Sequence, residues 1–157
     1  MVMSIAATHS RSSTGIPGMV RSTIRALERT PSSVLTLLMR CGIAAVFFKS
    51  GLTKIASWQA TVQLFDMEYQ VPLLPPELAA YLAATAELTC PVLIVLGLAT
   101  RLGALMLLGM TAVIQVFVYP ENWSEHLLWA SILIYLATRG AGAISLDRAI
   151  ARSWLRR

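Results

Sequence analysis

Charged residues are scarce in this chain. Only 13% of its 157 residues are Asp, Glu, Lys or Arg, whereas a soluble domain usually carries about 25%. Hydrophobic residues make up 56% of the chain, and the mean hydropathy is +0.65. This composition argues against an ordinary soluble domain and predicts a membrane protein with a single membrane domain.

Cysteine is equally scarce, and the chain has only Cys41 and Cys90. Both lie within apolar runs, without CxxC or CxxCH spacing, so we predict no secreted disulfide framework, no redox motif and no metal site. A lone intramembrane histidine, His126, cannot supply the two axial ligands of a bis-imidazole haem, and we predict no cofactor within the chain. The two thiols fall at similar depths, so a redox pair stays open beside the commoner interpretation of small buried packing groups.

The N-terminal segment, residues 1–33, lacks the continuous apolar core of a secretion signal. It is rich in Ser, Thr and Arg. Met19, Val20, Ile24 and Leu27 share one face of a helical wheel, which predicts a short amphipathic helix on an anionic membrane surface. A transit peptide has a similar composition and remains a minor alternative.

Four apolar runs follow, and each approaches the roughly 20 residues that a helix needs to cross a bilayer. The fourth run is the shortest, and the turn between the second and third is so short that these two helices must be antiparallel neighbours. The runs are residues 34–52, 78–99, 101–119 and 123–138. We therefore predict an all-α polytopic membrane protein, a four-transmembrane-helix bundle.

The basic residues predict the orientation of this bundle. Four arginines lie in the N-terminal tail, five lie after the fourth run, and the turn between the second and third runs holds Arg101. The other two connections hold only Lys54, so both termini are predicted in the cytoplasm. Because the basic residues flank apolar runs, we predict no nucleic-acid binding. We expect a basic tail at 1–33, a membrane domain at 34–150 and a basic tail at 151–157, with a short interfacial helix starting near residues 145–147.

Glu87 lies near the middle of the second run. A carboxylate at that depth costs a few kcal/mol, so it should face protein and have a partner. Arg40 and Lys49 are the candidates in the first run, and a rise of about 1.5 Å per residue places Arg40 about 18 Å and Glu87 about 14 Å from the outer ends of their helices. Arg40 and Glu87 can therefore meet if the two helices pack together, and Lys49 is the other candidate partner. We interpret an Arg40–Glu87 pair preferably as a salt bridge that determines helix register and alternatively as a proton or ligand site.

A second polar group is predicted near the outer ends of the helices. Lys49, Gln115 and His126 lie within a turn or two of those ends, and Glu125 is next to the histidine. Such a group could bind a quinone headgroup or a small anion. The preferred alternative is that these side chains reach the aqueous interface without binding anything. The candidate intramembrane polar site comprises Arg40, Lys49, Lys54, Glu87, Gln115 and His126, and Cys41 and Cys90 are the candidate thiols.

Several motifs, in this order and spacing, resemble the DoxX family. They are Arg40 with GIAAVFFKSGLTK at residues 42–54, Glu87, LGLATRLGAL at residues 96–105, and GAGAISLDR at residues 140–148. The resemblance covers roughly residues 34–150. It implies a four-helix protein of the bacterial inner membrane, and family members are associated with membrane redox systems, including a subunit of a thiosulfate:quinone oxidoreductase. The positions carried over are Arg40, Lys54, Glu87, Arg101, Ser145 and Asp147, with a glycine break at Gly140 and Gly142.

The predicted function is an accessory or anchoring subunit of a membrane redox system that is quinone- or thiol-linked. The chain contains no self-sufficient catalytic motif, so enzymatic activity is expected at most as part of an oxidoreductase complex. The expected partners are the lipid bilayer and membrane redox proteins. An enzyme that uses Glu87 or the two thiols, a small-solute transporter and a membrane scaffold are the alternatives. The sequence predicts neither the substrate nor the oligomeric state.

Overall fold

The computed structural model describes residues 16–154, and helices are the only regular elements in that range. The described residues divide into two compact units, one that ends at residue 31 and one that begins at residue 32. The first unit contains α1 (Ile16–Glu28). The second contains α2 (Ser32–Ala56), α3 (Trp58–Leu64), the π-helical turn η1 (Phe65–Tyr69), α4 (Pro76–Leu96), α5 (Thr100–Val113), the π-helical turn η2 (Ile114–Val118), the 3-10 turn η3 (Pro120–Asn122), α6 (Trp123–Arg139) and α7 (Leu146–Trp154).

The predicted helix of the N-terminal segment is confirmed as α1. Val20, Ile24 and Leu27 are spaced by four and three residues, so they lie on one side of the helix, and all three are exposed. Its position on a membrane surface stays a prediction.

Three helical segments are long and apolar enough to cross a membrane: Ser32–Ala56, Pro76–Leu96 and Thr100–Val118. The last of these joins α5 to η2. The fourth predicted span corresponds to α6, which has 17 residues and is shorter than these three. The all-α membrane class is therefore confirmed, while the count of four crossings stays a prediction.

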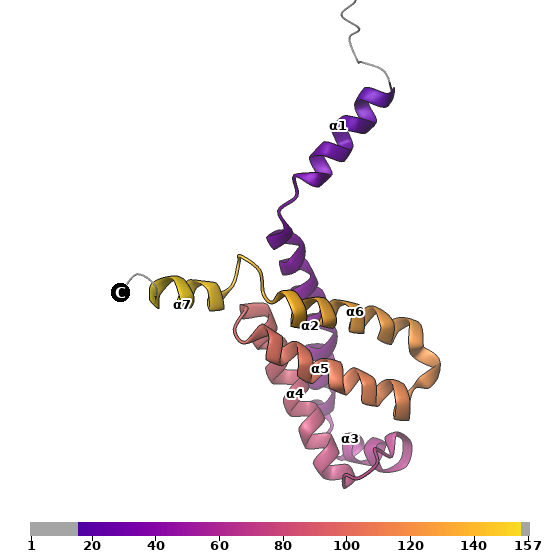
Figure 1. Ribbon diagram of the computed structural model, residues 1–157. Helices are drawn as coiled ribbons and strands as arrows, with labels where there is room; N and C mark the ends of the chain where they lie inside the picture. The colour runs from indigo at the N-terminus through magenta and orange to yellow at the C-terminus, as the bar shows by residue number, and fades with distance from the viewer. Residues whose placement is uncertain (1–15, 155–157) are drawn as a thin grey trace, which may run out of the picture. The chain divides into compact units, whose positions relative to one another are not determined.

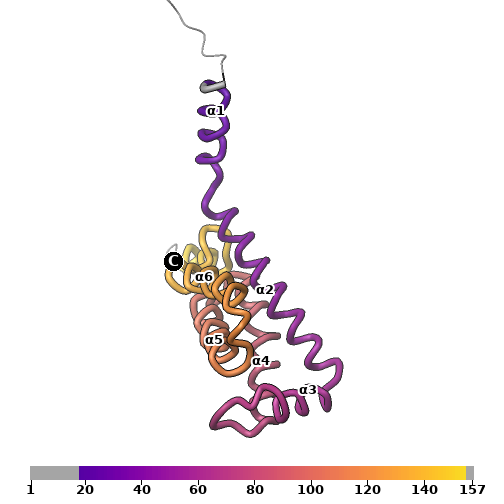
Figure 2. The backbone as a smooth tube through the Cα atoms, turned by 90° about the vertical axis from the view of Figure 1, so that its right-hand side faces the viewer, coloured from indigo at the N-terminus to yellow at the C-terminus, as the bar shows by residue number. Residues whose placement is uncertain are grey.

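Two pairs of helices, α2 with α4 and α5 with α6, make the most extensive contacts in the second unit. Figures 1 and 2 show α2 alongside α4, with α5 between α4 and α6. Buried side chains from all four helices meet in one apolar core. Its members are Ile43, Phe47, Cys90, Ile94, Ala104, Leu107, Leu133 and Leu136.

The end of α4 differs from the predicted end at residue 99. Gly97 has a φ of 71° and donates its N–H to the carbonyl of Ile94, and Leu98 donates to Leu93. This is the Schellman arrangement, which glycine adopts at little cost in a left-handed conformation. The helix therefore stops at Leu96.

The connector before α4 is more ordered than the sequence predicts. Its prolines were expected to prevent a continuous helix, and α3 and η1 form before them. Phe65 of η1 packs on Ala79 and Ala80 of α4 to form a second small core. Trp58 lies against Tyr81, with 4.3 Å between ring centroids. These contacts hold η1 next to the start of α4.

The short helix predicted after the glycine break is confirmed as α7 (yellow in Figure 1). The Oγ of Ser145 accepts a hydrogen bond of 3.3 Å from the N–H of Arg148, which caps the start of the helix. Leu146, Ile150 and Trp154 are exposed and follow one another at four-residue intervals. α7 therefore presents an apolar stripe to its surroundings.

Candidate functional site

Arg40 does not pair with Glu87, and that prediction is wrong. Arg40 is 1% exposed and donates only to backbone carbonyls. Its Nε bonds the carbonyl of Ile94 at 2.6 Å and its Nη2 bonds that of Val95, both in the last turn of α4. Its Nη1 bonds Ala141 at 3.0 Å and Ile144 at 2.5 Å, in the loop before α7.

The error came from the helix ends. α2 continues four residues beyond the predicted end at Leu52, whereas α4 starts two residues before Leu78. Recounting from the observed ends puts Arg40 about 24 Å and Glu87 about 16.5 Å from the ends of their helices, so Arg40 lies about 7.5 Å deeper. At its own depth Arg40 meets the free carbonyls at the end of α4, which carry the negative end of the helix dipole.

Glu87 instead pairs with Lys54. Its Oε2 lies 2.8 Å from the Nζ of Lys54, and its Oε1 accepts a hydrogen bond of 2.9 Å from the same nitrogen. Ser50 completes the group, since its Oγ accepts from Lys54 at 2.9 Å and donates to Oε1 at 3.2 Å. Glu87 is 3% exposed. The prediction that this carboxylate faces protein is thus confirmed, with a different partner.

This carboxylate keeps a capacity to accept hydrogen bonds. Oε2 is buried and lies 2.8 Å from the ammonium of Lys54. Each carboxylate oxygen has two lone pairs, so the group has acceptor capacity beyond its bonds to Lys54 and Ser50.

The local sequence explains why these groups meet. Ser50 and Lys54 are four residues apart, so they share one face of α2. Gly51 lies between them, and a Cβ added there would come within 2.9 Å of Leu88 and 3.1 Å of the Cβ of Glu87. Only glycine therefore lets α2 approach α4 closely enough for Lys54 to bond Glu87.

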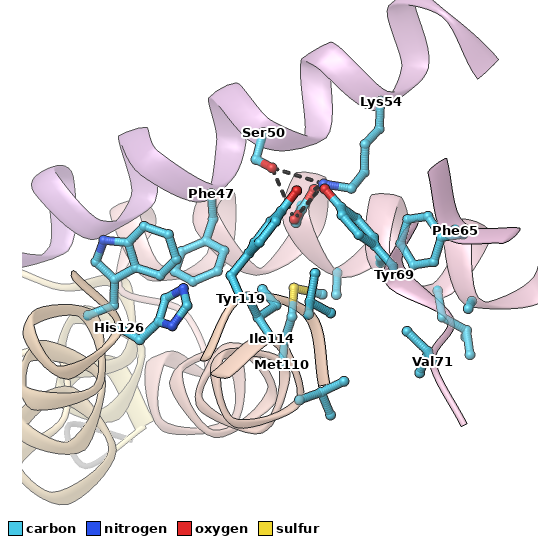
Figure 3. A pocket seen from close by; sticks show the side chains of 18 of the residues that line it. Phe47, Ser50, Lys54, Phe65, Tyr69, Val71, Met110, Ile114, Tyr119 and His126 are labelled. Atoms are coloured by element: carbon cyan, nitrogen blue, oxygen red, sulfur yellow. Dashed lines mark hydrogen bonds and ion pairs between the residues drawn. The ribbon is translucent and has the colours of Figure 1, made fainter. Parts of the chain in front are cut away.

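This ion pair lines a cavity of about 570 Å³ between α2, α4, α5, α6 and η1 (Figure 3). Most of its wall is apolar, with Phe47, Phe65 and Met110 among the larger side chains. Its polar wall comprises Ser50, Lys54, Tyr69, Glu87, Tyr119, Asn122, Glu125 and His126. A mainly apolar cavity with a few grouped polar atoms is typical of a site for a small amphipathic molecule.

Two tyrosines form the wall on the side of η1 and the end of η2. The rings of Tyr69 and Tyr119 meet edge to face with centroids 5.7 Å apart, and the Oη of Tyr119 donates to the carboxylate of Glu68 at 2.6 Å. That hydrogen bond raises the pKa of Tyr119, and burial raises the pKa of Tyr69. Both phenols therefore remain protonated donors through the physiological range.

The structure brings together only part of the predicted outer polar group. His126 is buried and its Nδ1 lies 2.7 Å from the Oε1 of Gln115, and both His126 and Glu125 line the cavity. Lys49 is exposed and does not line it. Five residues of α-helix turn a side chain by about 140°, so Lys49 and Lys54 cannot share a face of α2.

The two thiols lie in different surroundings. Cys41 is exposed on α2, whereas Cys90 is 2% exposed in the core, with its Sγ 3.9 Å from the Sδ of Met106. Both are free cysteines. Within residues 16–154 no group of three His, Cys, Asp or Glu side chains could hold a metal ion.

Sequence reasoning missed Ser50, Tyr69 and Tyr119. The spacing of Ser50 and Lys54 was a usable signal, because it marks one helix face that carries both a hydroxyl and an ammonium group. The tyrosines had no such signal. They meet because η1 and η2 contact each other, and those two segments are far apart in the sequence.

Apolar helices that enclose an ion pair and a cavity define a membrane protein with a polar interior. The family model named DoxX matches residues 35–120, and the chain belongs to the DoxX family. The matched residues include Arg40, Lys54 and Glu87, whereas the resemblance at Ser145 and Asp147 lies beyond them.

Three curated relatives cover most of the chain. An uncharacterized protein of Haemophilus influenzae is 30% identical over 140 residues, which is 80% of this chain and 92% of the relative. A Bacillus subtilis protein named "Putative oxidoreductase CatD" is 34% identical over 71% of this chain and 84% of the relative. Inner membrane protein YphA of Escherichia coli is 32% identical over 73% of this chain and 89% of the relative. No solved structure matches the chain.

Proposed function

We propose that this DoxX protein binds a quinone-class molecule in the cavity beside Lys54 and Glu87, as an accessory subunit of a membrane redox system. The observation that carries the proposal is the polar group of Ser50, Lys54 and Glu87 on the wall of an otherwise mainly apolar cavity. A quinol has the matching chemistry, because its ring and tail are apolar and its hydroxyl groups are donors.

The two redox forms of such a ligand would use different partners. The hydroxyl of a quinol would donate to the carboxylate of Glu87. The carbonyl of a quinone needs a donor instead, and the Nζ of Lys54 and the Oη of Tyr69 are on the same wall. Lys54 also neutralises the carboxylate, which lets this charged acceptor sit among apolar helices.

The residues of this site bind and orient a ligand. The electron donor or acceptor would be a partner protein, which is why we propose an accessory role. The name of the Bacillus subtilis relative supports a link to oxidoreductases, and that of the Escherichia coli relative supports the inner membrane. A scaffold or solute transporter without a redox role is the alternative, and it predicts no saturable quinone binding.

For the topology we propose four crossings with both termini in the cytoplasm. α6 would be the fourth crossing, since its 17 residues span about 25 Å and Leu133 and Leu136 are fully buried in the shared core. The excess of arginine in the two tails supports the orientation. A C-terminal reporter fusion that is active outside the cytoplasm would contradict it.

The binding proposal can be tested by titrating the detergent-solubilised protein with a short-chain quinone and following tryptophan fluorescence. Trp129 lines the cavity, so an aromatic ligand should quench it. Lys54→Gln should weaken binding about tenfold, because a hydrogen bond to a charged group contributes about 1.5–3 kcal/mol.

Lys49→Gln is the matched control for this experiment. It changes the same residue type on the same helix, outside the cavity, and should leave the affinity unchanged. Equal affinities for both variants, or no saturable quenching, would contradict the proposal. The accessory role is tested separately by identifying the proteins that co-purify with the chain in mild detergent.

A further inference from the structure

A second cavity, of about 530 Å³, lies at the other end of the bundle and shares no residue with the first. It is enclosed by the start of α2, the end of α6 and the segment that leads into α7. Its wall consists of Ser32, Ser33, Thr36, Tyr135, Arg139, Gly140, Gly142, Ala143 and Arg148. No acidic side chain lines it, so its charge is that of the two arginines.

The two arginines reach the cavity from different elements. Arg139 is the last residue of α6, and Arg148 lies in the first turn of α7. Within residues 16–154 neither guanidinium group makes a hydrogen bond or an ion pair. Each guanidinium group presents five N–H donors in a planar fork that matches the oxygens of a phosphate group.

Hydroxyl groups and the first turn of α2 line the opposite wall. Thr36 is 3% exposed, donates to the carbonyl of Ser32 at 2.9 Å and lies 3.3 Å from the hydroxyl of Tyr135. The hydroxyls of Ser32 and Ser33 make no hydrogen bond with the described residues, so they can donate to a ligand. The first-turn amides and the dipole of this 25-residue helix add to the positive potential.

The segment that carries Arg148 is held in place before any ligand arrives. The N–H of Asp147 donates to the carbonyl of Gly97 at 3.0 Å, and its Oδ1 accepts from the N–H of Ala99 at 3.1 Å. The Oγ of Ser145 accepts from the N–H of Arg148 and donates to the carbonyl of Gly142 at 3.0 Å. The bonds of Asp147 join α7 to the turn between α4 and α5, and those of Ser145 join the start of α7 to the loop before it. The backbone at Arg148 is therefore preorganised.

From this geometry we propose that the second cavity is a phosphate-binding site and that its ligand is the headgroup phosphate of an anionic phospholipid. The apolar stripe of α7, formed by Leu146, Ile150 and Trp154, is exposed on the same helix that carries Arg148. A basic helix with such a stripe lies in the plane of a membrane interface, which places the cavity at the depth of the headgroups. The same phosphate chemistry would also accept free phosphate, and the experiment separates the two sources.

The test uses thermal unfolding of the full chain in a neutral detergent at constant ionic strength. Three additives are compared: short-chain phosphatidylglycerol, short-chain phosphatidylcholine and inorganic phosphate. Phosphatidylglycerol should raise the unfolding temperature in a saturable way. Phosphatidylcholine should raise the unfolding temperature less, since its choline group cancels the negative charge of the phosphate and is repelled by the two arginines.

Three variants of equal charge change make the test specific. Arg139→Gln and Arg148→Gln each remove one donor fork from the cavity and should each raise the half-saturating concentration of phosphatidylglycerol about tenfold. Arg152→Gln is the matched control, because Arg152 is on α7 but does not line the cavity. It should change that concentration by less than about twofold.

Each outcome decides between the two sources or overturns the site. If inorganic phosphate produces the same saturable shift, and Arg139→Gln and Arg148→Gln weaken it, the site binds free phosphate and the assignment to lipid is overturned. If Arg152→Gln weakens phosphatidylglycerol binding as much as Arg139→Gln and Arg148→Gln do, the effect is general charge attraction and the site is overturned. The site is also overturned if phosphatidylglycerol does not raise the unfolding temperature. Should a variant not fold, arginine modification by a dicarbonyl reagent in the wild-type protein provides the same test. Phosphatidylglycerol should protect residues 139 and 148 but not 152, and unprotected residues 139 and 148 would overturn the proposal.

Discussion

Arg40 and Lys54 are two inward-facing cations on the same helix, separated by 14 residues or about 21 Å along α2. Arg40 donates to four backbone carbonyls that belong to α4 and to the loop before α7, and it lies in no cavity described above. Lys54 bonds a carboxylate and a hydroxyl, and all three groups line the larger cavity. One cation joins backbone segments in the packed interior, whereas the other belongs to a polar group on the wall of a cavity.

Burial of charge alone does not separate these two side chains, since both are largely buried. What separates them is whether the charge bonds backbone carbonyls in the packed interior or side chains on the wall of a cavity. The predictions below test this contrast, in order of decreasing effect.

Arg40→Met should cause the largest loss of stability. It leaves the carbonyls of Ala141 and Ile144 and the last carbonyls of α4 without these donors, and buried groups of this kind cost about 1–3 kcal/mol each. We expect the free energy of unfolding in detergent to fall by about 4 kcal/mol or more. Lys49→Met, on the outer face of the same helix, is the control. Equal stability of the two variants would contradict a structural role for Arg40.

Lys54→Met should have the next largest effect. It leaves Glu87 buried without a counter-ion, which costs about 3 kcal/mol. The double variant Lys54→Met/Glu87→Leu removes both charges and should recover most of that stability. It should not recover quinone binding in the fluorescence titration. A double variant that binds quinone as the wild type does would show that the pair is not the polar contact of the ligand.

Gly51→Ala should have a moderate effect on the same site. The added methyl group would meet Leu88 at 2.9 Å and push α2 away from α4 at the level of Glu87, at a cost of about 1–3 kcal/mol. Gly42→Ala is the matched control, since nothing lies within 4 Å of a Cβ built there. The comparison is made by thermal unfolding. If both variants unfold at the same temperature, the close approach of the two helices does not depend on Gly51.

The smallest effect concerns Tyr119, whose pKa is raised above 10.0 by its hydrogen bond to Glu68. A raised pKa in the folded state means that this bond stabilises the fold below pH 10 and that the contribution is lost as the pH rises through the folded pKa. Absorbance titration of tyrosinate should show this late-titrating group. Tyr119→Phe should remove it and Glu68→Gln should shift it downward. Identical curves for wild type and Glu68→Gln would contradict this assignment.

Much of the fold followed from the sequence because it depends on local properties. The apolar runs predict α2, α4, α5 and α6. The spacing of apolar residues predicts α1, and the helix-start signal at residues 145–147 predicts α7. Some helix ends did not follow. The last turn of α2 carries Thr53 and Lys54, which interrupt the apolar run after Leu52 although the helix continues to Ala56. α4 stops where Gly97 takes a left-handed conformation, which hydropathy does not register.

The candidate site was predicted only in part. Glu87 and Lys54 were identified, and so was the position of His126 near the start of α6. The pairing of Glu87 was wrong because a shift of two to four residues at a helix end moves the inferred depth by about 3–6 Å, which is enough to exchange one partner for another. Tyr69 and Tyr119 could not be placed, because their contact depends on how η1 packs against η2.

By itself, the sequence determined that the chain is helical, that it belongs in a membrane, and that Glu87 must find a cation inside the protein. The requirement at Glu87 follows from the cost of desolvating a carboxylate in apolar surroundings, which is the same in any arrangement of the helices. Only the tertiary structure decided which cation meets Glu87. That choice depends on where each helix ends and on the close approach of α2 to α4 at Gly51. Both are properties of how α2 packs on α4.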